Sequence, residues 1–245
     1  ERRYLPALAS LDYSRAAHYI LQYQKLTSQR TFRVEAFYKK YSDLYKTTVS
    51  LGGQEAASSN NGFGDAKGVE LFWRDRKTFK DVDYWISYSY LDTKRDYLNY
   101  PYAITPSFAA NHTASLVVKR FVVPWKTGFN LSYSFATGRP YYRIAYDNAQ
   151  SKYVITDAGK TINYNSMSFS VNYLPALGKK NPKVFTVWVL GVNNVLGQNQ
   201  VFNYNYSNDG SRKVPVTPPS KRFIFIGCFL SFGVDRTQDA INNNL

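Results

Sequence analysis

Polar and apolar side chains alternate residue by residue along much of the chain, most clearly in 82–91, 129–135 and 166–173. Successive side chains of a β-strand point to opposite faces, so this pattern predicts strands with one apolar and one polar face. Helical periodicity is almost absent. About nine strands are expected, at roughly 14–25, 30–46, 66–79, 82–96, 111–122, 125–139, 161–174, 183–196 and 221–233.

The lengths of these strands and of their connections favour a membrane barrel. Most of the strands have about 12–16 residues, whereas strands of globular sheets usually have ~5–6 and a membrane crossing needs ~9–11. Outer-membrane barrels also alternate tight periplasmic turns with extended extracellular loops. Here the connections at 27–29, 80–81, 123–124 and 178–182 are short, and those at 47–65, 97–110, 140–160 and 197–220 are long.

Composition agrees with strands that cross a membrane. Hydrophobic residues make up 44% of the chain, yet its mean hydropathy is -0.41, and no run approaches the ~18 apolar residues of a membrane helix. A barrel strand exposes only every second side chain to lipid, so its mean hydropathy stays low. The 22 Tyr, 16 Phe and 4 Trp suit a boundary between lipid and water. We therefore predict an all-β fold, a transmembrane antiparallel β-barrel.

A soluble β-sandwich is the structural alternative, because its strands also alternate. Sandwich strands recur every ~8–12 residues, and nothing in a sandwich requires loops of alternating length. In the barrel the interior is expected to receive Ser87, Ser132, Ser134, Ser168 and Ser170. Lipid is expected to contact Tyr84, Ile86, Tyr88, Leu116, Val118, Leu131, Tyr133, Phe169 and Val171.

The net charge of +14 raises the question of nucleic-acid binding. The basic residues do not line one helix or one compact motif, so we expect no nucleic-acid partner. They lie near the short turns instead, where they are either ordinary solvated charge or within reach of anionic phospholipid head groups. The residues concerned are Lys25, Arg30, Arg33, Arg74, Arg76, Lys77, Lys80, Lys119, Arg120, Lys126, Lys179, Lys180 and Lys183.

Several segments resemble the C-terminal barrel of TonB-dependent outer-membrane transporters, and the likeness runs along nearly the whole chain. The last strand, Phe223 to Phe232, alternates and ends on an aromatic residue, as the closing strand of that family does. The other segments that carry the resemblance are 30–38, 61–71, 87–92, 136–141 and 192–196.

The resemblance implies that 1–234 is the C-terminal portion of a barrel of about 22 strands, and that 235–245 is a short periplasmic tail. It implies a location in the bacterial outer membrane, in contact with its lipid. The partners would be an N-terminal plug and upstream barrel strands outside these 245 residues, TonB acting through the missing N-terminal region, and in some cases a surface lipoprotein. The implied function is energised ligand uptake, with no cofactor and no enzymatic activity. A passive or structural barrel without a plug, and a soluble carbohydrate-binding module, are the alternatives.

Two features of the resembling segments have physical roles of their own. Glu35 and Glu70 fall on strand faces opposite apolar neighbours, so they can point into a wet or plugged lumen. The dipeptide at 61–62 favours a primed turn. Three glycines suit a loop that re-enters a strand with positive φ or a close backbone approach: Gly62, Gly64 and Gly68.

The two histidines give no basis for a metal or catalytic site. His18 and His112 have no Cys or His cluster around them at ligand spacing. His112 follows a long loop, and with Asp92 or Asp96 it could form a pair that activates water. We expect His18 to be a lumen-facing or interfacial polar residue and both to be structural. The single cysteine, Cys228, is expected to be a small hydrophobic residue of a strand.

The long loops carry the candidate ligand contacts. Aromatic rings with an arginine suit a sugar, a peptide or a catechol-type chelate; the alternative is a loop that packs on itself. The candidates are Arg139, Tyr141, Tyr142 and Tyr146 in one loop and Phe202, Tyr204 and Tyr206 in another.

The parity of the connections bears on closure. Because the first connection is short and the last is long, the first and last strands both descend from the cell surface. Nine strands could close only through a parallel pair, whereas bacterial barrels have even strand numbers. We therefore expect an open arc whose edge strands pair with strands outside this chain.

Overall fold

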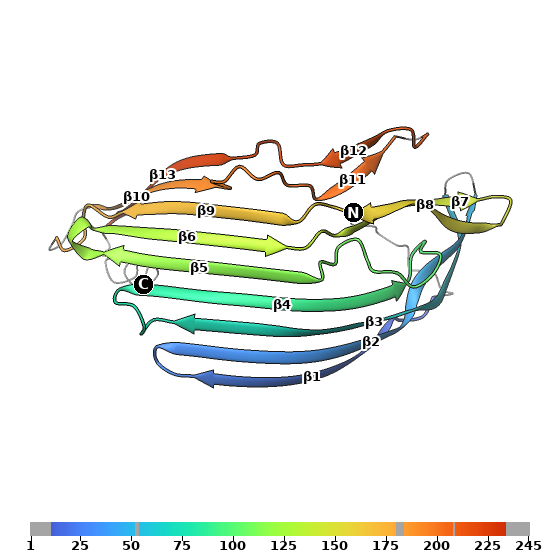
Figure 1. Cartoon of the computed structure of the whole chain (residues 1–245), viewed down its shortest axis with the longest axis horizontal. Helices are drawn as coiled ribbons and strands as arrows, with labels where there is room; N and C mark the ends of the chain where they lie inside the picture. Colours follow the sequence, from blue (N-terminus) through green and yellow to red (C-terminus); the bar gives the residue numbers. More distant parts are fainter. Residues whose placement is uncertain (1–10, 52–53, 180–183, 208, 234–245) are drawn as a thin grey trace.

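Nine strands form one antiparallel sheet in the computed structural model, which describes residues 11–51, 54–179, 184–207 and 209–233 (Figure 1). The order across the sheet is β1-β2-β3-β4-β5-β6-β9-β10-β13, so all nine predicted strands are present. Within the described ranges, no helix is long and apolar enough to span a membrane. The strands are β1 (Arg15–Leu26), β2 (Arg30–Leu51), β3 (Gln54–Asp75), β4 (Val82–Asp96), β5 (His112–Val122), β6 (Thr127–Ala136), β9 (Tyr164–Tyr173), β10 (Val184–Asn193) and β13 (Phe223–Phe232).

Two of the expected long loops contain small hairpins. β7 (Pro140–Asp147) pairs with β8 (Lys152–Lys160), and β11 (Asn203–Tyr206) pairs with β12 (Lys213–Val216). Both hairpins lie at the same end of the sheet, which we call the loop end; the opposite end, with the short connections, is the turn end (Figure 1). A 3-10 helix, Val123–Trp125, forms one of the short connections, as the expected corner at 123–124 requires.

The expected loop at 47–65 is wrong. β2 and β3 have 22 residues each, and Leu51 still pairs with Gln54 across several register shifts. β1 pairs with β2 only as far as Ser42, and β4 pairs with β3 only as far as Phe63. Beyond those points the two strands pair with no further strand of the sheet, although Lys46 forms an isolated bridge with Leu98. No sheet neighbours impose one apolar and one polar face there, so the alternation that marks a strand is lost.

The end of β3 also differs from expectation. The predicted strand 66–79 ends at Asp75, whose carboxylate accepts hydrogen bonds from the backbone N–H groups of Lys77 (2.6 Å) and Thr78 (2.9 Å). An aspartate that bonds the chain two and three residues later stabilises a turn instead of a strand. The short connection therefore starts directly after Asp75.

The glycines of β3 are needed for close approach and not for a turn. The primed turn expected at 61–62 is wrong, because both residues lie inside β3, and neither Gly62 nor Gly68 has a positive φ. A Cβ on Gly68 would lie 2.1 Å from the carbonyl oxygen of Tyr90 and 2.7 Å from the ring of Phe37. The space beside Gly68 is thus filled by an aromatic ring of the neighbouring strand.

The sheet has one apolar and one polar face, as the alternation predicted. On the apolar face Tyr84 is in register with Val118, which pairs with Leu131, and Ile86 is in register with Leu116. On the polar face Ser87 pairs with Ser115 and Ser115 with Ser134. In β3 to β10 the strongly exposed large hydrophobic residues all have the parity of the apolar face: Phe63, Val69, Leu71, Ile86, Tyr90, Phe169, Tyr173, Trp188 and Leu190.

A small apolar core lies at the turn end. Phe121 and Phe185 pack with Leu174, Ala176 and Leu177, and all five are buried. Both phenylalanines have the parity of the polar face: Phe121 lies an even number of residues after Ser115 in β5, and Phe185 lies an odd number of residues before Trp188, which has apolar-face parity, in β10. The connection after β9 is thereby folded onto the polar face.

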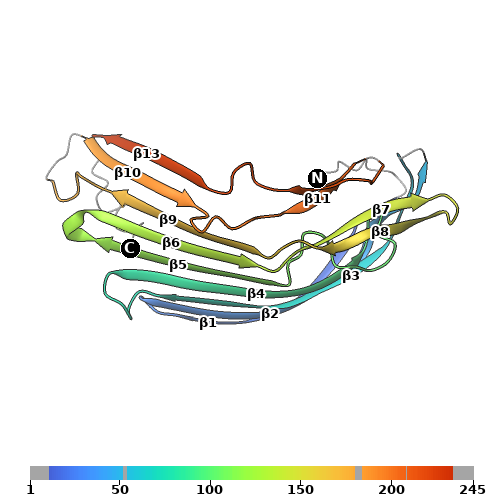
Figure 2. The ribbon, with the colours of Figure 1, turned by 45° about the horizontal axis from the view of Figure 1, so that its top comes forward.

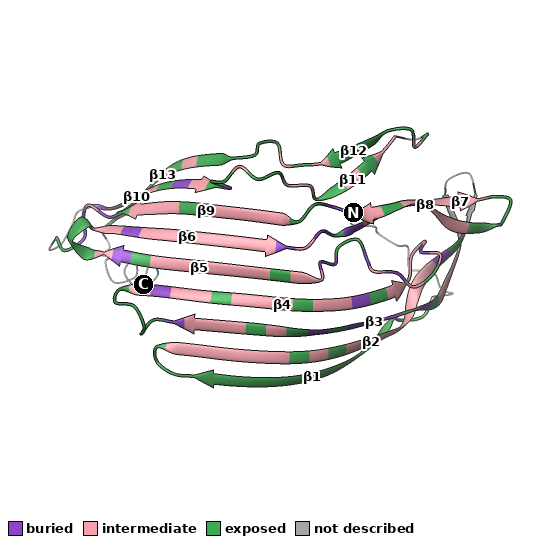
Figure 3. Ribbon diagram, viewed as in Figure 1, coloured by how far each residue is buried: buried purple, intermediate pink, exposed green. Residues whose placement is uncertain are grey.

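The two edges of the sheet are unpaired within the described residues. β1 and β13 lie at opposite sides of a curved sheet (Figures 1 and 2). Every residue of β1 is exposed, as its uniform colour in Figure 3 shows. The expected open arc is confirmed, and the proposed tail at 235–245 lies outside the described residues.

Candidate functional site

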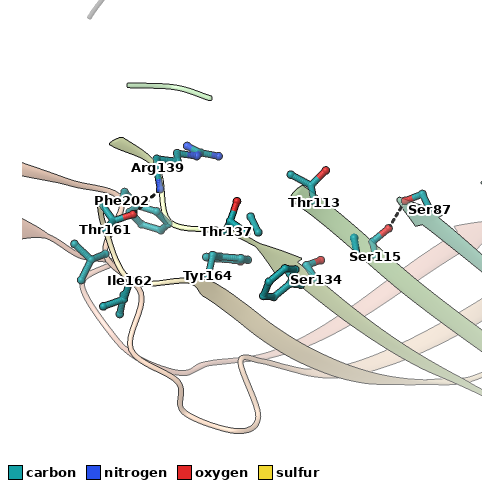
Figure 4. A pocket seen from close by; sticks show the side chains of 14 residues that line it. Ser87, Thr113, Ser115, Ser134, Thr137, Arg139, Thr161, Ile162, Tyr164 and Phe202 are labelled. Carbon is teal, nitrogen blue, oxygen red and sulfur yellow. Dashed lines mark hydrogen bonds between the residues drawn. The ribbon is translucent and has the colours of Figure 1, made fainter. Parts of the chain in front are cut away.

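A cavity of about 430 Å³ lies where the polar face meets the loop end (Figure 4). The strands supply its polar wall, and the segments that begin and end the two long loops supply the rest. It is lined by Ser87, Thr113, Ala114, Ser115, Ser134, Phe135, Ala136, Thr137, Arg139, Thr161, Ile162, Tyr164, Val201 and Phe202.

The register of the sheet explains the hydroxyl groups in this cavity. Ser87, Ser115 and Ser134 are neighbours across β4, β5 and β6, and the Ser87 and Ser115 hydroxyls lie 2.7 Å apart. A period of two repeated in adjacent strands necessarily puts residues of one kind in a row. The row offers several small donors and acceptors on a rigid sheet, which suits a polar ligand.

Loop residues complete the cavity with one cation and two rings. The Arg139 backbone N–H donates to the Thr161 hydroxyl (3.0 Å), which fixes the start of the loop to its end. The exposed Arg139 side chain has no ion-pair or hydrogen-bond partner among the described residues. The ring of Tyr164, at the start of β9, lies 6.4 Å from that of Phe202 in the loop between β10 and β13. The arrangement can bind a small polar ligand that carries an anionic group.

The structure divides the seven candidate ligand residues into three groups. Arg139 and Phe202 line the cavity. Tyr142 contacts Tyr100 (ring centroids 6.1 Å apart), and Tyr146 contacts Tyr153 (5.2 Å), so both pack within the loop region. The remaining three surround Lys213 where the two hairpins meet, and the rings of the first two lie 4.7 Å apart: Tyr141, Tyr204 and Tyr206.

A lysine joins the two hairpins. The Lys213 ammonium of β12 lies 3.9 Å from the ring centroid of Tyr141 and 4.8 Å from that of Tyr204. It donates to the Tyr141 hydroxyl and forms an ion pair with Asp157 of β8 (3.0 Å). The Tyr206 hydroxyl donates to the same carboxylate (2.5 Å). We call Lys213, Asp157, Tyr141, Tyr204 and Tyr206 the latch.

The contacts within the latch shift the pKa values of its charged groups in the directions that stabilise their charges. Hydrogen bonds from Tyr206 and Lys213 lower the pKa of Asp157, because they favour its charged form. The hydrogen bond to Tyr141, with that to Asp157, raises the pKa of Lys213. Burial, with the hydrogen bond to Asp157, raises the pKa of Tyr206 to about 12. At neutral pH Lys213 is therefore a cation, Asp157 a carboxylate and Tyr206 a neutral phenol.

Sequence reasoning missed the partners of these tyrosines. Lys213 and Asp157 are separated by 56 positions, and nothing in either loop indicates which face meets the other. The serine row was detectable, because its parity was already assigned. Tyr164 was missed as a site residue because it lies at the start of a strand and not in the predicted loop.

Neither histidine is among the residues that line the cavity. His112 Nδ1 is 2.8 Å from the Tyr88 hydroxyl on the apolar face, and the ring of Tyr90 lies 5.2 Å away. Neither Asp92 nor Asp96 bonds to it among the described contacts: Asp92 pairs with Lys67 and Asp96 with Lys46. In the part of the chain that the structure describes, no group of three or more His, Cys, Asp or Glu could hold a metal ion.

Known structures match the chain over most of its length. The outer membrane transporter YddB from Escherichia coli matches 91% of this chain with 33% of its own, at a TM-score of 0.66 and 15% identity. The ferric yersiniabactin uptake receptor FyuA from Yersinia pestis matches 89% with 30% of its own (TM-score 0.64, 17% identity). The FrpB iron transporter from Neisseria meningitidis matches 89% with 30% of its own (0.60, 14%).

No protein-family model matches the chain, and a comparison with curated proteins gives no match. The identities of 14–17% to these three structures establish a fold. All three are outer-membrane transporters or receptors of the TonB-dependent class, which agrees with the resemblance of the sequence segments. The chain spans about a third of their length and has the fold of the corresponding part of their barrel.

Proposed function

We propose that the chain is part of the barrel of a transporter in the bacterial outer membrane, which takes up a ligand with energy supplied through TonB. The observation that carries the proposal is the exposed apolar face of a nine-stranded sheet with the fold of such barrels. Lipid would cover that face, since a soluble protein rarely exposes so large a contiguous apolar surface. The polar face would then line the lumen.

Charges on the polar face support a filled lumen. Glu35 and Glu70 lie directly opposite each other in β2 and β3, with Ser89 next to Glu70 in β4. Like charges in directly opposed positions are destabilising. Neither carboxylate has an ion pair with a described residue. A cationic group from a plug domain outside this chain would relieve the repulsion.

The cavity at the loop end would form part of the ligand vestibule, with Arg139 and Phe202 as contacts. Among the structural neighbours, one is named for ferric citrate and one was solved with pyoverdine bound. Both names refer to small polar molecules, a class that the serine row and the free Arg139 suit. The latch would hold the two hairpins beyond the cavity.

Loop deletions in the full-length protein test this function. Removing the hairpin tip at 147–152, or that at 207–212, should abolish ligand uptake while the barrel still inserts into the outer membrane. Uptake is measured with labelled ligand in energised cells and again after the proton gradient is collapsed. Uptake that survives both deletions would exclude these loops as the vestibule, and uptake that persists without the gradient would favour a passive channel.

A further inference from the structure

An exposed arginine lies at the turn end of the apolar face. Arg120 of β5 is in register with Val82 on one side and with Phe129 on the other. It has the same parity as Val118 and Leu116, and it forms no hydrogen bond or ion pair with a described residue. A cation on a lipid-facing surface costs ~2–4 kcal/mol at the midplane but only ~0–1 near the interface. On the proposed membrane location, Arg120 therefore lies at the border of lipid and water.

Aromatic residues of two turns flank this arginine. Phe79 packs on Tyr84 with ring centroids 5.9 Å apart, and Trp125 packs on Phe129 at 6.2 Å. Tyr84 and Phe129 both belong to the apolar face, so each turn folds a ring onto that face. The side chains remain exposed, at 57% for Phe79 and 65% for Trp125. Aromatic rings at this height are typical of the interfacial belt of a membrane protein.

The charge beside these rings is positive. The turn after β3 carries the exposed cations Arg76, Lys77 and Lys80, which form no ion pair with a described residue. The acidic groups nearby are mostly occupied: Asp75 accepts from Arg30 (2.9 Å) and Asp83 from Arg74. Asp81 alone in this turn offers a negative charge without an ion pair in the described part.

We propose that Arg120 and Lys80, between Phe79 and Trp125, bind the phosphate of an anionic phospholipid in the periplasmic leaflet. The planar guanidinium suits two phosphate oxygens, and the lysine adds a point charge. The acyl chains would lie on the apolar face beside Ile86. The turn end lies opposite the long loops, which selects a phospholipid of the inner leaflet over the lipids of the cell surface.

Lipid retention by the full-length protein tests this site. The protein is purified in mild detergent from nanodiscs of phosphatidylethanolamine with a minor fraction of phosphatidylglycerol, and the bound lipids are quantified by mass spectrometry. The Arg120→Gln/Lys80→Gln variant should retain several-fold less bound phosphatidylglycerol than the wild type, with no change in bound phosphatidylethanolamine. Arg120→Lys, which keeps the charge without the planar fork, should retain an intermediate amount.

The control removes two exposed lysines at the loop end, Lys152→Gln and Lys160→Gln, and should leave phosphatidylglycerol unchanged. The proposal would be overturned if the wild type and the Arg120→Gln/Lys80→Gln variant retained equal amounts of phosphatidylglycerol. If that double variant fails to insert, the amount retained by Lys80→Gln alone is compared with that of the wild type instead. Membrane insertion and uptake are measured in parallel. A wild-type protein that does not insert into the membrane refutes the proposed function. A wild-type protein that inserts but does not retain phosphatidylglycerol selectively refutes only this site.

Discussion

At the scale of single residues, the glycine at position 68 is the sharpest constraint on the sheet. Gly68→Ala would place a methyl group against the Tyr90 carbonyl oxygen and the Phe37 ring. A backbone carbonyl in a paired strand has little room to move, so we expect a loss of ~1–3 kcal/mol, the range for overpacking. The measurement is the apparent Tm of the full-length barrel in detergent.

The matched control is Gly227→Ala in β13. Among the described residues its added Cβ would meet nothing closer than the ring of Phe229 at 3.5 Å, which is an ordinary contact. The control should leave the apparent Tm close to that of the wild type. Equal shifts for the two variants would show that the cost comes from glycine replacement in general and not from the contact beside Gly68.

The candidate site was only partly accessible from the sequence at this scale. Arg139 adjoins the cavity because it follows β6, whose end the alternation located within a few residues; Phe202 lies within the predicted loop, directly before β11. Tyr141 and Tyr204 were identified as aromatic loop residues, but their partners depend on how two hairpins dock. That docking joins residues of separate loops through Lys213, and no local pattern encodes it.

At the scale of elements, the latch between the β7–β8 and β11–β12 hairpins should be insensitive to pH over a broad window. Asp157 has its pKa lowered in the latch, so its contribution is present above the ordinary value of 3.8 and is lost as the pH falls through the lowered value. Lys213 has its pKa raised, so its contribution is present below 10.5 and is lost only as the pH rises through the raised value. We expect a closed latch from about pH 5 to about pH 9.

Distances between spin labels at positions 152 and 212 measure the latch, in full-length protein carrying Cys228→Ala. The distribution should be narrow and constant across that window. Lys213→Met should broaden it at every pH, because the ion pair and the contact with Tyr141 are lost together. Lys160→Met is the control and should leave the distribution narrow. A narrow distribution in the Lys213 variant would mean that other contacts hold the hairpins.

Strands were predictable from sequence only where the sheet has two different environments. In β4 to β6 an apolar face and a polar face impose alternation, and all three strands were located within a few residues. Residues 47–51 and 54–61 belong to strands that the sequence did not indicate, since there β2 and β3 extend beyond their pairing with β1 and β4 and no sheet neighbours impose two different faces. The pattern thus reports the surroundings of a strand more than its backbone conformation.

At the scale of the whole molecule, the open edges of β1 and β13 would need partners in the proposed membrane location. Nine antiparallel strands begin and end in the same direction, so direct closure would need a parallel pair between β1 and β13. Unpaired backbone groups in lipid cost several kcal/mol each. An odd number of further strands, supplied from outside this chain, would satisfy both edges and give an even total.

The native cysteine allows this closure to be tested in outer membranes that contain the full-length protein. Cys228 of β13 is in register with Trp188 of β10, so Trp188→Cys should form a disulfide with it on mild oxidation. Tyr19→Cys, Leu21→Cys and Tyr23→Cys place a thiol along β1 with the parity of the apolar face, the face on which Cys228 lies. None of the three should cross-link to Cys228, because other strands separate the two edges. A disulfide from any β1 position would show a self-contained small barrel, which has no room for a plug, and the proposal of an active transporter would then fail.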